Sequence, residues 1–129
     1  MNKILVEVSI GELLDKISIL EIKQEKIKDV ENLKFINNEL SILKDQLNKN
    51  VNSDDKLKNL YQSLKDINSK LWVIEDDKRQ CEKNKDFGEK FIRLSRDVHF
   101  LNDDRAKIKL EINNHTGSKI KEIKEYTNY

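Results

Sequence analysis

The sequence contains no proline and only three glycines in 129 residues. Proline breaks helices and glycine weakens them, so the scarcity of both favours long helices. There is one cysteine, which excludes an intramolecular disulfide bond. No apolar run approaches the roughly 18 residues that would suggest a transmembrane helix, so we expect no membrane insertion.

The first residues, MNKILVEVSIGE, contain neither the apolar core nor the small-residue cleavage site of a secretory signal peptide. This absence predicts a cytoplasmic protein. Charged residues form 38% of the chain, yet the net charge is only +1 because both signs are interleaved throughout. A nucleic-acid-binding protein is expected to gather positive charge on one face, so we expect no nucleic-acid partner.

What the sequence does have is a helical spacing of leucine and isoleucine. These residues recur three and four positions apart through most of the chain, which is typical of helices that pack along one face. We predict an all-α fold in which about four main helices form an antiparallel bundle, with a long hairpin made by the third and fourth. Residues 1–129 are expected to form a single domain.

Polar residues mark the expected starts of the first three helices. Ser9-Ile10-Gly11-Glu12 has the form of a capping box, which predicts that the first helix begins there. Asp29 is expected to cap the second helix. A polar break follows over residues 48–55, and Ser53 or Asp54 is expected to cap the third helix.

The third helix is expected to run from about Asp55 to Asn84, with Cys81 on its apolar face and therefore in the core. Asp86 and Glu89 have the capping-box spacing expected at the start of the fourth helix. Gly117 suits the end of that helix, because glycine adopts the left-handed backbone conformation that commonly terminates helices.

Both ends of the chain are expected to lie outside the main helices. Residues 1–9 show apolar residues at alternate positions, Ile4, Val6 and Val8, which is typical of an extended segment. We expect this arm to lie against the helices or to pair with a second copy of the chain. Residues 118–129 are expected to form a short C-terminal helix or a tail.

The chain's four arginines all fall within residues 71–105, and its other basic residues are lysines. They are Arg79, Arg93, Arg96 and Arg105. Arginine is expected where a planar guanidinium must bind a carboxylate or phosphate with two hydrogen bonds. Arg105 also replaces an apolar residue on a helical stripe, and a charge at such a position needs a partner.

Two alternatives remain open for these arginines. They could line an anion-binding groove in which Trp72 or His99 provides a stacking surface. They could instead form ordinary surface ion pairs at helical spacing, each of which stabilises a helix by only about 0.2–0.5 kcal/mol. Pairs with that spacing are Glu75 with Arg79 and Arg93 with Asp97.

Some carboxylates are also spaced to share a helix face. Glu12 and Asp15 are three residues apart in the expected first helix, and Glu75 and Asp103 lie on the expected third and fourth helices. Carboxylate oxygens suit Mg²⁺, which would be the one expected cofactor. Because the chain has 24 acidic residues, such pairs also arise by chance, and no metal ligand is assigned.

Three polar motifs carry a resemblance to a known family. They are VSIGELLDKISILEIK at residues 8–23, LWVIEDDKRQCEKNKDFGEKF at residues 71–91 and NDDRAKIKLEIN at residues 102–113. With these motifs the chain resembles a bacterial family of short helical proteins of unknown function, often encoded beside genes for cell-surface polysaccharide or glycosyltransferase proteins. The resemblance covers nearly the whole chain and implies a helical domain linked to surface-glycan metabolism, but no activity.

The motifs and the arginine-containing stretch together define a candidate polar cluster. Its members are Glu12, Asp15, Lys16, Trp72, Glu75, Asp76, Arg79, Arg93, Arg96, Asp97, Asn102, Asp103 and Arg105. The favoured function is a non-enzymatic accessory or protein-interaction module that forms a homodimer or binds a protein partner. The alternative is a small ligand-binding protein or Mg²⁺-dependent enzyme acting on a nucleotide, a nucleotide sugar or another phosphorylated compound. No catalytic residue is identified.

Overall fold

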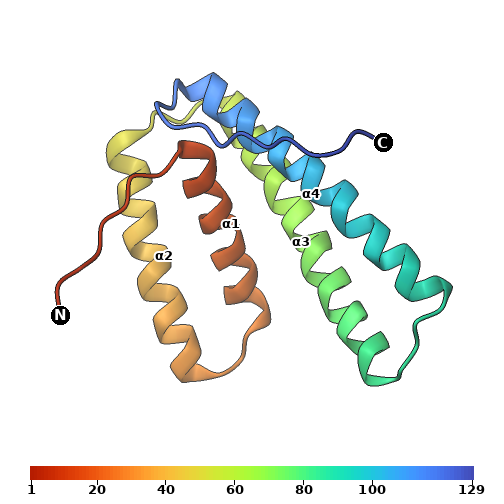
Figure 1. The fold of residues 1–129 in the computed structure, drawn as a ribbon. Helices are drawn as coiled ribbons and strands as arrows, with labels where there is room; N and C mark the ends of the chain where they lie inside the picture. Colours follow the sequence, from red (N-terminus) through yellow and green to blue (C-terminus); the bar gives the residue numbers. More distant parts are fainter.

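The computed structural model describes residues 1–129 and contains four helices and no strand (Figure 1). The helices are α1 (Ile10–Lys26), α2 (Val30–Asn50), α3 (Asp55–Lys83) and α4 (Glu89–Thr116). Consecutive helices run in opposite directions, so the prediction of an all-α antiparallel bundle is confirmed (Figure 1). None of the helices is long and apolar enough to cross a membrane.

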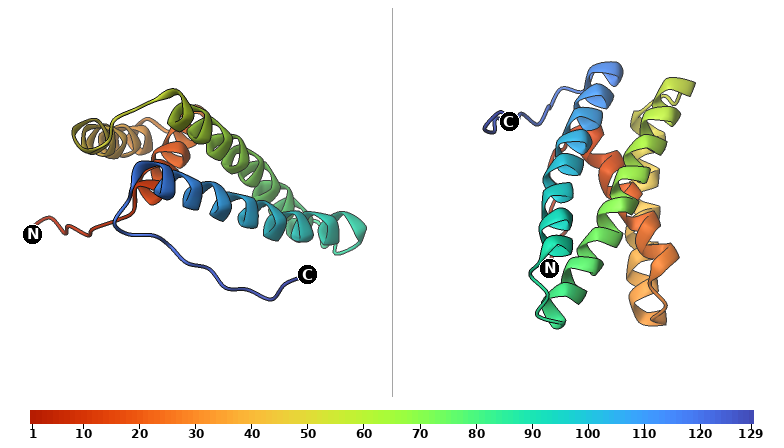
Figure 2. Two further views of the ribbon diagram at one scale, coloured as in Figure 1. Left: turned by 90° about the horizontal axis from the view of Figure 1, so that it is seen from above. Right: turned by 90° about the vertical axis from the view of Figure 1, so that its right-hand side faces the viewer.

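Helix α1 is the element against which the others pack. It contacts α2, α3 and α4, whereas α2 contacts α1 alone among the helices at the level of the backbone. The α1–α2 and α3–α4 hairpins diverge from the end at which α1 begins (Figures 1 and 2). Because α1 has 17 residues and α3 has 29, α3 is longer by roughly 18 Å at 1.5 Å per residue.

The apolar core consists of two small clusters that share α1. One cluster joins α1 to α3 and α4 through Leu14, Leu57, Leu64 and Ile112. The other joins α1 to α2 through Ile17, Leu20, Ile36 and Leu40. The far half of the α3–α4 hairpin has little core, since its buried apolar residues are Cys81 and Leu94. Cys81 is therefore a core residue, as predicted.

Side-chain caps confirm the predicted starts of three helices. The Ser9 hydroxyl accepts a hydrogen bond from the Glu12 amide at 3.0 Å, and Asp29 and Asp54 cap α2 and α3 in the same way. Gly117 ends α4 in the left-handed conformation, with φ of 67°, which confirms its predicted role.

The predicted cap of α4 is wrong. The N-cap residue is Gly88, which has no side chain to cap the helix. The Asp86 carboxylate instead accepts a hydrogen bond from the Gly88 amide at 3.1 Å. Aspartate commonly closes a turn onto an amide two residues ahead, so Asp86 shapes the α3–α4 connection, and Glu89 is simply the first residue of the helix.

The polar break is shorter than expected, because helix α2 continues to Asn50 and leaves residues 51–54 outside the helices. Of the two alternatives for residues 118–129, the structure shows a tail without a helix. Polar contacts with α1 and α4 hold this segment in an irregular path. The surface pairs considered for the arginines, Glu75 with Arg79 and Arg93 with Asp97, do not form. Pairs between exposed charged groups are weak, because water solvates the separated charges well.

Candidate functional site

A buried carboxylate lies at the junction of α1, α3 and α4. Asp15 of α1 is only 2% exposed. Arg105 of α4 donates two hydrogen bonds to it, from Nε to Oδ1 at 2.9 Å and from Nη2 to Oδ2 at 2.5 Å. This is the partner that a charge on the apolar stripe of α4 was expected to need.

Helix α3 joins the same junction through an amide side chain. Asn68 Nδ2 donates to Asp15 Oδ1 at 2.9 Å and to Ser18 Oγ at 2.8 Å. The Ser18 hydroxyl in turn donates to the backbone carbonyl of Asp15 at 2.7 Å. Both Asn68 and Ser18 are buried, so these hydrogen bonds satisfy polar groups that would otherwise lose their solvation.

Lys109 extends the ionic contacts toward the C-terminal tail. Its Nζ lies 2.7 Å from Glu12 Oε2, 2.9 Å from Glu122 Oε2 and 4.0 Å from Asp15 Oδ2. Lys109 is only 7% exposed. We call Glu12, Asp15, Asn68, Arg105, Lys109 and Glu122 the polar junction.

The backbones of α1 and α4 approach closely beside the polar junction. A Cβ atom on Gly11 would lie 2.6 Å from the carbonyl oxygen of Lys109, which is too close for any other residue without movement of a helix. The Gly11 amide donates to Asn113 Oδ1 at 2.7 Å, and the Ile10 amide donates to Ser118 Oγ at 3.1 Å. The start of α1 is thus fixed against the end of α4.

The hydrogen bonds keep the groups of the polar junction charged. Burial alone would raise the pKa of Asp15, but hydrogen bonds from Arg105 and Asn68 and the nearby positive charges outweigh it, so the pKa lies below its usual value. Burial would lower the pKa of Lys109, but its bonds to Glu12 and Glu122 raise it. The hydrogen bond to Asp15 raises the pKa of Arg105. The junction therefore acts as a set of satisfied ion pairs that ties the helices together.

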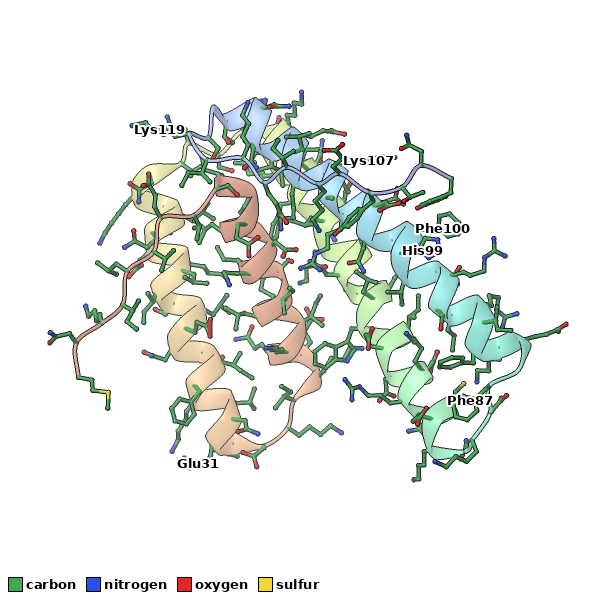
Figure 3. All side chains as sticks on the ribbon, viewed as in Figure 1. Glu31, Phe87, His99, Phe100, Lys107 and Lys119 are labelled. Atoms are coloured by element: carbon green, nitrogen blue, oxygen red, sulfur yellow. The ribbon has the colours of Figure 1, made fainter.

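The tail has a further contact at its end. The Tyr129 ring packs edge-on against His99 and Phe100, with ring centroids 5.2 and 5.4 Å apart, and its hydroxyl donates to the Asp103 carboxylate. Figure 3 shows His99 and Phe100 on α4. Together with the Lys109–Glu122 pair, this contact holds the tail beside α4.

The structure brings only part of the candidate polar cluster together. Glu12, Asp15 and Arg105 meet in the polar junction, and Lys16 lies at its edge, 3.8 Å from Glu12. The other arginines, Arg79, Arg93 and Arg96, are exposed and form no ion pair.

The remaining candidates lie along the α3–α4 hairpin. Trp72 and Asn102 are half-buried, Glu75 and Asp76 are exposed, and Asp103 contacts Tyr129. No three histidine, cysteine, aspartate or glutamate side chains are grouped so that they could hold a metal ion.

Sequence reasoning missed several members and neighbours of the polar junction. They are Gly11, Ser18, Lys109, Asn113, Ser118 and Glu122. A signal was present for two of them, since Lys109 and Asn113 follow Arg105 at intervals of four residues and therefore share its helix face.

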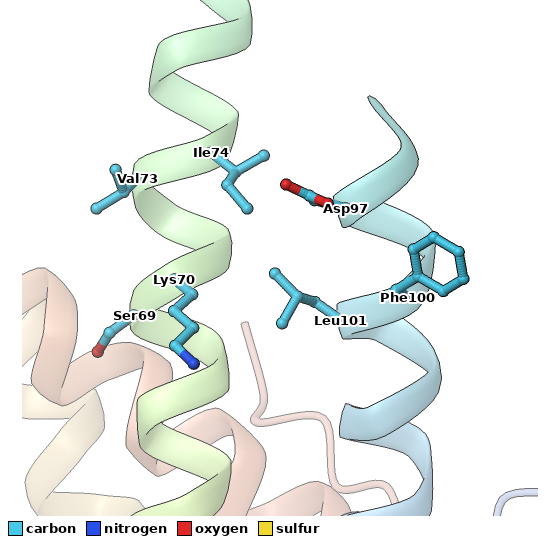
Figure 4. Close-up of a pocket in the computed structure, with 7 residues that line it drawn as sticks. All are labelled: Ser69, Lys70, Val73, Ile74, Asp97, Phe100 and Leu101. Carbon is cyan, nitrogen blue, oxygen red and sulfur yellow. The ribbon is translucent and has the colours of Figure 1, made fainter. Parts of the chain in front are cut away.

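A second feature is an open groove between α3 and α4, farther along the hairpin. It has a volume of about 620 Å³ and is lined by Ser69, Lys70, Val73, Ile74, Asp97, Phe100 and Leu101. Ile74, Asp97 and Leu101 point toward the space between the helices (Figure 4). We call this feature the α3–α4 groove.

The fold and the polar junction define an all-α protein in which ion pairs join α1 to α4 and a buried amide hydrogen bond joins α3 to the same carboxylate. Comparison with protein families identifies it more closely. The chain belongs to DUF6165, a family of unknown function, whose model matches residues 4–129. No curated protein and no solved structure matches the chain.

Proposed function

We propose that the chain is a non-enzymatic helical interaction module that associates with a second copy of itself through the α3–α4 groove. The observation that carries this proposal is the exposure of apolar side chains at the groove. Val73 is 50% exposed and Phe100 is 40% exposed, one on each helix. Apolar side chains exposed on both sides of one groove support an interaction site there.

The rest of the far half of the hairpin supports the same proposal. Ile92 is 55% exposed and Phe87, at the turn of the hairpin (Figure 3), is 50% exposed. Covering apolar surface yields about 25 cal/mol per Å² removed from water. A second polypeptide on the far half would supply the burial that α1 provides for the near half.

The alternative is a ligand-binding protein or a Mg²⁺-dependent enzyme for a nucleotide, a nucleotide sugar or another phosphorylated compound. The strongest support for this alternative is Arg105, because it is half-buried whereas the other three arginines are exposed. That guanidinium already binds Asp15 through two of its nitrogens, which favours a structural role. A thermal-shift screen with nucleotides, nucleotide sugars and Mg²⁺ separates the two functions, since a ligand at 100 times its Kd stabilises the fold by about 2.7 kcal/mol.

The setting we propose is the bacterial cytoplasm, where the module would serve the synthesis of cell-surface glycans. The basis is the resemblance of its three polar motifs to a family encoded beside glycosyltransferase genes. The proposed association with a second copy of the chain does not depend on this setting.

Sedimentation velocity over a range of protein concentrations tests the proposed association. We expect the natural chain to form dimers and the double variant Val73→Asp/Phe100→Asp to remain monomeric. Phe35→Asp is the matched control, because Phe35 is 76% exposed on α2, away from the groove. A natural chain that stays monomeric at about 100 μM, or a groove variant that associates as the natural chain does, would overturn the proposal.

A further inference from the structure

A second cavity, separate from the α3–α4 groove, lies between α1, α2 and α3. Its volume of about 340 Å³ falls within the roughly 300–1,000 Å³ typical of small-molecule sites. Helices α2 and α3 both pack on α1 but make no backbone contact with each other, and this arrangement leaves a space between them. We call this cavity the three-helix pocket.

The apolar part of the three-helix pocket belongs to the buried core. Leu14 and Ile17 of α1 and Leu57 of α3 line it and are 3%, 2% and 4% exposed. Leu47 of α2 and Tyr61 of α3 also line it, and both pack against the two core clusters. A molecule with an apolar body would therefore extend the core by entering this pocket.

Tyr61 gives the three-helix pocket an unused hydrogen-bonding group. Its hydroxyl is the one enclosed side-chain nitrogen or oxygen that has no hydrogen-bond partner. The residue lines the pocket, so a small outward turn of the ring would present the hydroxyl to an oxygen of a bound molecule. Such a hydrogen bond would offset the cost of burying the hydroxyl.

The charged residues of the three-helix pocket favour an anion. Lys44 and Lys58 line it together with a single acid, Glu21. Glu21 is already shared, because Lys44 Nζ and Lys65 Nζ lie 3.9 and 4.0 Å from its Oε2. Lys58 is exposed and forms no ion pair. Because Lys58 and Tyr61 are three positions apart on α3, they share a helix face, and one anionic group can contact both.

We propose that the three-helix pocket binds a small monocarboxylate with an apolar chain. The carboxylate accepts hydrogen bonds from the Tyr61 hydroxyl and the Lys58 ammonium, and the chain packs on the buried leucine and isoleucine side chains. A phosphate is less suited, because no arginine lines the pocket and arginine forks favour phosphate binding. The proposal goes beyond the function proposed above and does not depend on it, since the pocket and the α3–α4 groove share no residue.

Titration of the full chain with sodium octanoate tests this site. Calorimetry measures the affinity, and amide chemical shifts locate the binding. Acetate has the carboxylate without the chain, and octyltrimethylammonium has the chain with the opposite charge, so the two probes separate the contributions of head group and chain.

The test variants are Tyr61→Phe, which keeps the ring, and Lys58→Gln, which removes an exposed charge. Their matched controls are Tyr126→Phe, at a 70% exposed position, and Lys28→Gln, at an exposed position between α1 and α2. Circular dichroism confirms that each variant retains its helices.

We expect saturable binding of octanoate, with shift changes centred on the three-helix pocket. Acetate and octyltrimethylammonium should each bind at least about tenfold more weakly. Octanoate should bind about fivefold more weakly to Tyr61→Phe and about threefold more weakly to Lys58→Gln, while both controls bind it as the natural chain does.

Three results would overturn the proposal. Octanoate could fail to bind at about 5 mM, it could bind at a surface outside the three-helix pocket, or it could bind Tyr61→Phe as tightly as the natural chain. Equal binding of octanoate and octyltrimethylammonium would overturn the assignment of a carboxylate. None of these results bears on dimer formation, which sedimentation velocity measures separately.

Discussion

The Arg105 guanidinium binds the buried Asp15 carboxylate through two parallel hydrogen bonds of 2.9 and 2.5 Å, although the residues are 90 positions apart. This pair ties the first helix to the last. Breaking a buried ion pair from one side leaves an uncompensated charge and costs more than the pair itself contributes.

Replacement of Arg105 by methionine should destabilise the fold by about 3 kcal/mol, because Asp15 would be left buried with only Asn68 and Lys109 nearby. Urea denaturation followed by circular dichroism measures this change. Arg93→Met is the control, since Arg93 is exposed and unpaired, and it should change the free energy of unfolding by less than about 0.5 kcal/mol. Equal effects of the two substitutions would contradict the role assigned to the ion pair.

Gly11→Ala should destabilise the fold by about 1–3 kcal/mol, because the new Cβ would meet the backbone oxygen of Lys109 and force α1 away from α4. Gly88→Ala provides a matched comparison. Its Cβ would lie 3.4 Å from the nearest atom, a side-chain oxygen of Asp86. Thermal unfolding of both variants distinguishes them, and a Gly11→Ala protein as stable as the natural chain would show that the helices do not approach as closely as described.

The stability of the fold should fall in acid because of Asp15. Its pKa in the folded state lies below the ordinary value of 3.8, so its contribution is complete above about pH 5. That contribution is lost as the pH falls through 3.8 toward the lower folded-state pKa. The free energy of unfolding measured by urea between pH 2 and 6 should therefore change less steeply in Asp15→Asn, and an unchanged acid slope would contradict this account.

The Tyr61 hydroxyl is buried and has no hydrogen-bond partner, although its ring packs against both core clusters. An unsatisfied buried hydroxyl carries a desolvation cost of about 1–3 kcal/mol. Tyr61→Phe keeps the ring and should raise the free energy of unfolding by up to about 1 kcal/mol. Tyr126→Phe, at a 70% exposed position, should leave it unchanged. A clearly destabilised Tyr61→Phe protein would mean that the hydroxyl has a partner.

The helices could be predicted from the sequence because their signals are local. Leucine and isoleucine at helical spacing and the caps at Ser9, Asp29 and Asp54 act within a few residues of one another. The prediction of Asp86 as the cap of α4 failed because an aspartate shortly before a glycine can close a turn as well as cap a helix. The sequence also could not decide whether residues 118–129 form a helix or a tail, because contacts with α1 and α4 determine the path of this segment.

The polar junction could be predicted only in part. Arg105 stood out as a charge on an apolar stripe, but nothing in the sequence linked it to Asp15 across 90 positions. Closeness in sequence was also misleading for the arginines. Arg93 and Arg105 lie on one helix, where 12 positions correspond to roughly 18 Å, so they do not share a site.

The central claim is that the α3–α4 groove joins two copies of the chain, and isotope-filtered nuclear Overhauser spectroscopy tests it most directly. In an equimolar mixture of labelled and unlabelled protein, every filtered signal arises between copies. We expect such signals from the methyl groups of Val73 and Ile74. Signals between copies that arise only from other surfaces, or no such signals at about 500 μM protein, would contradict the claim.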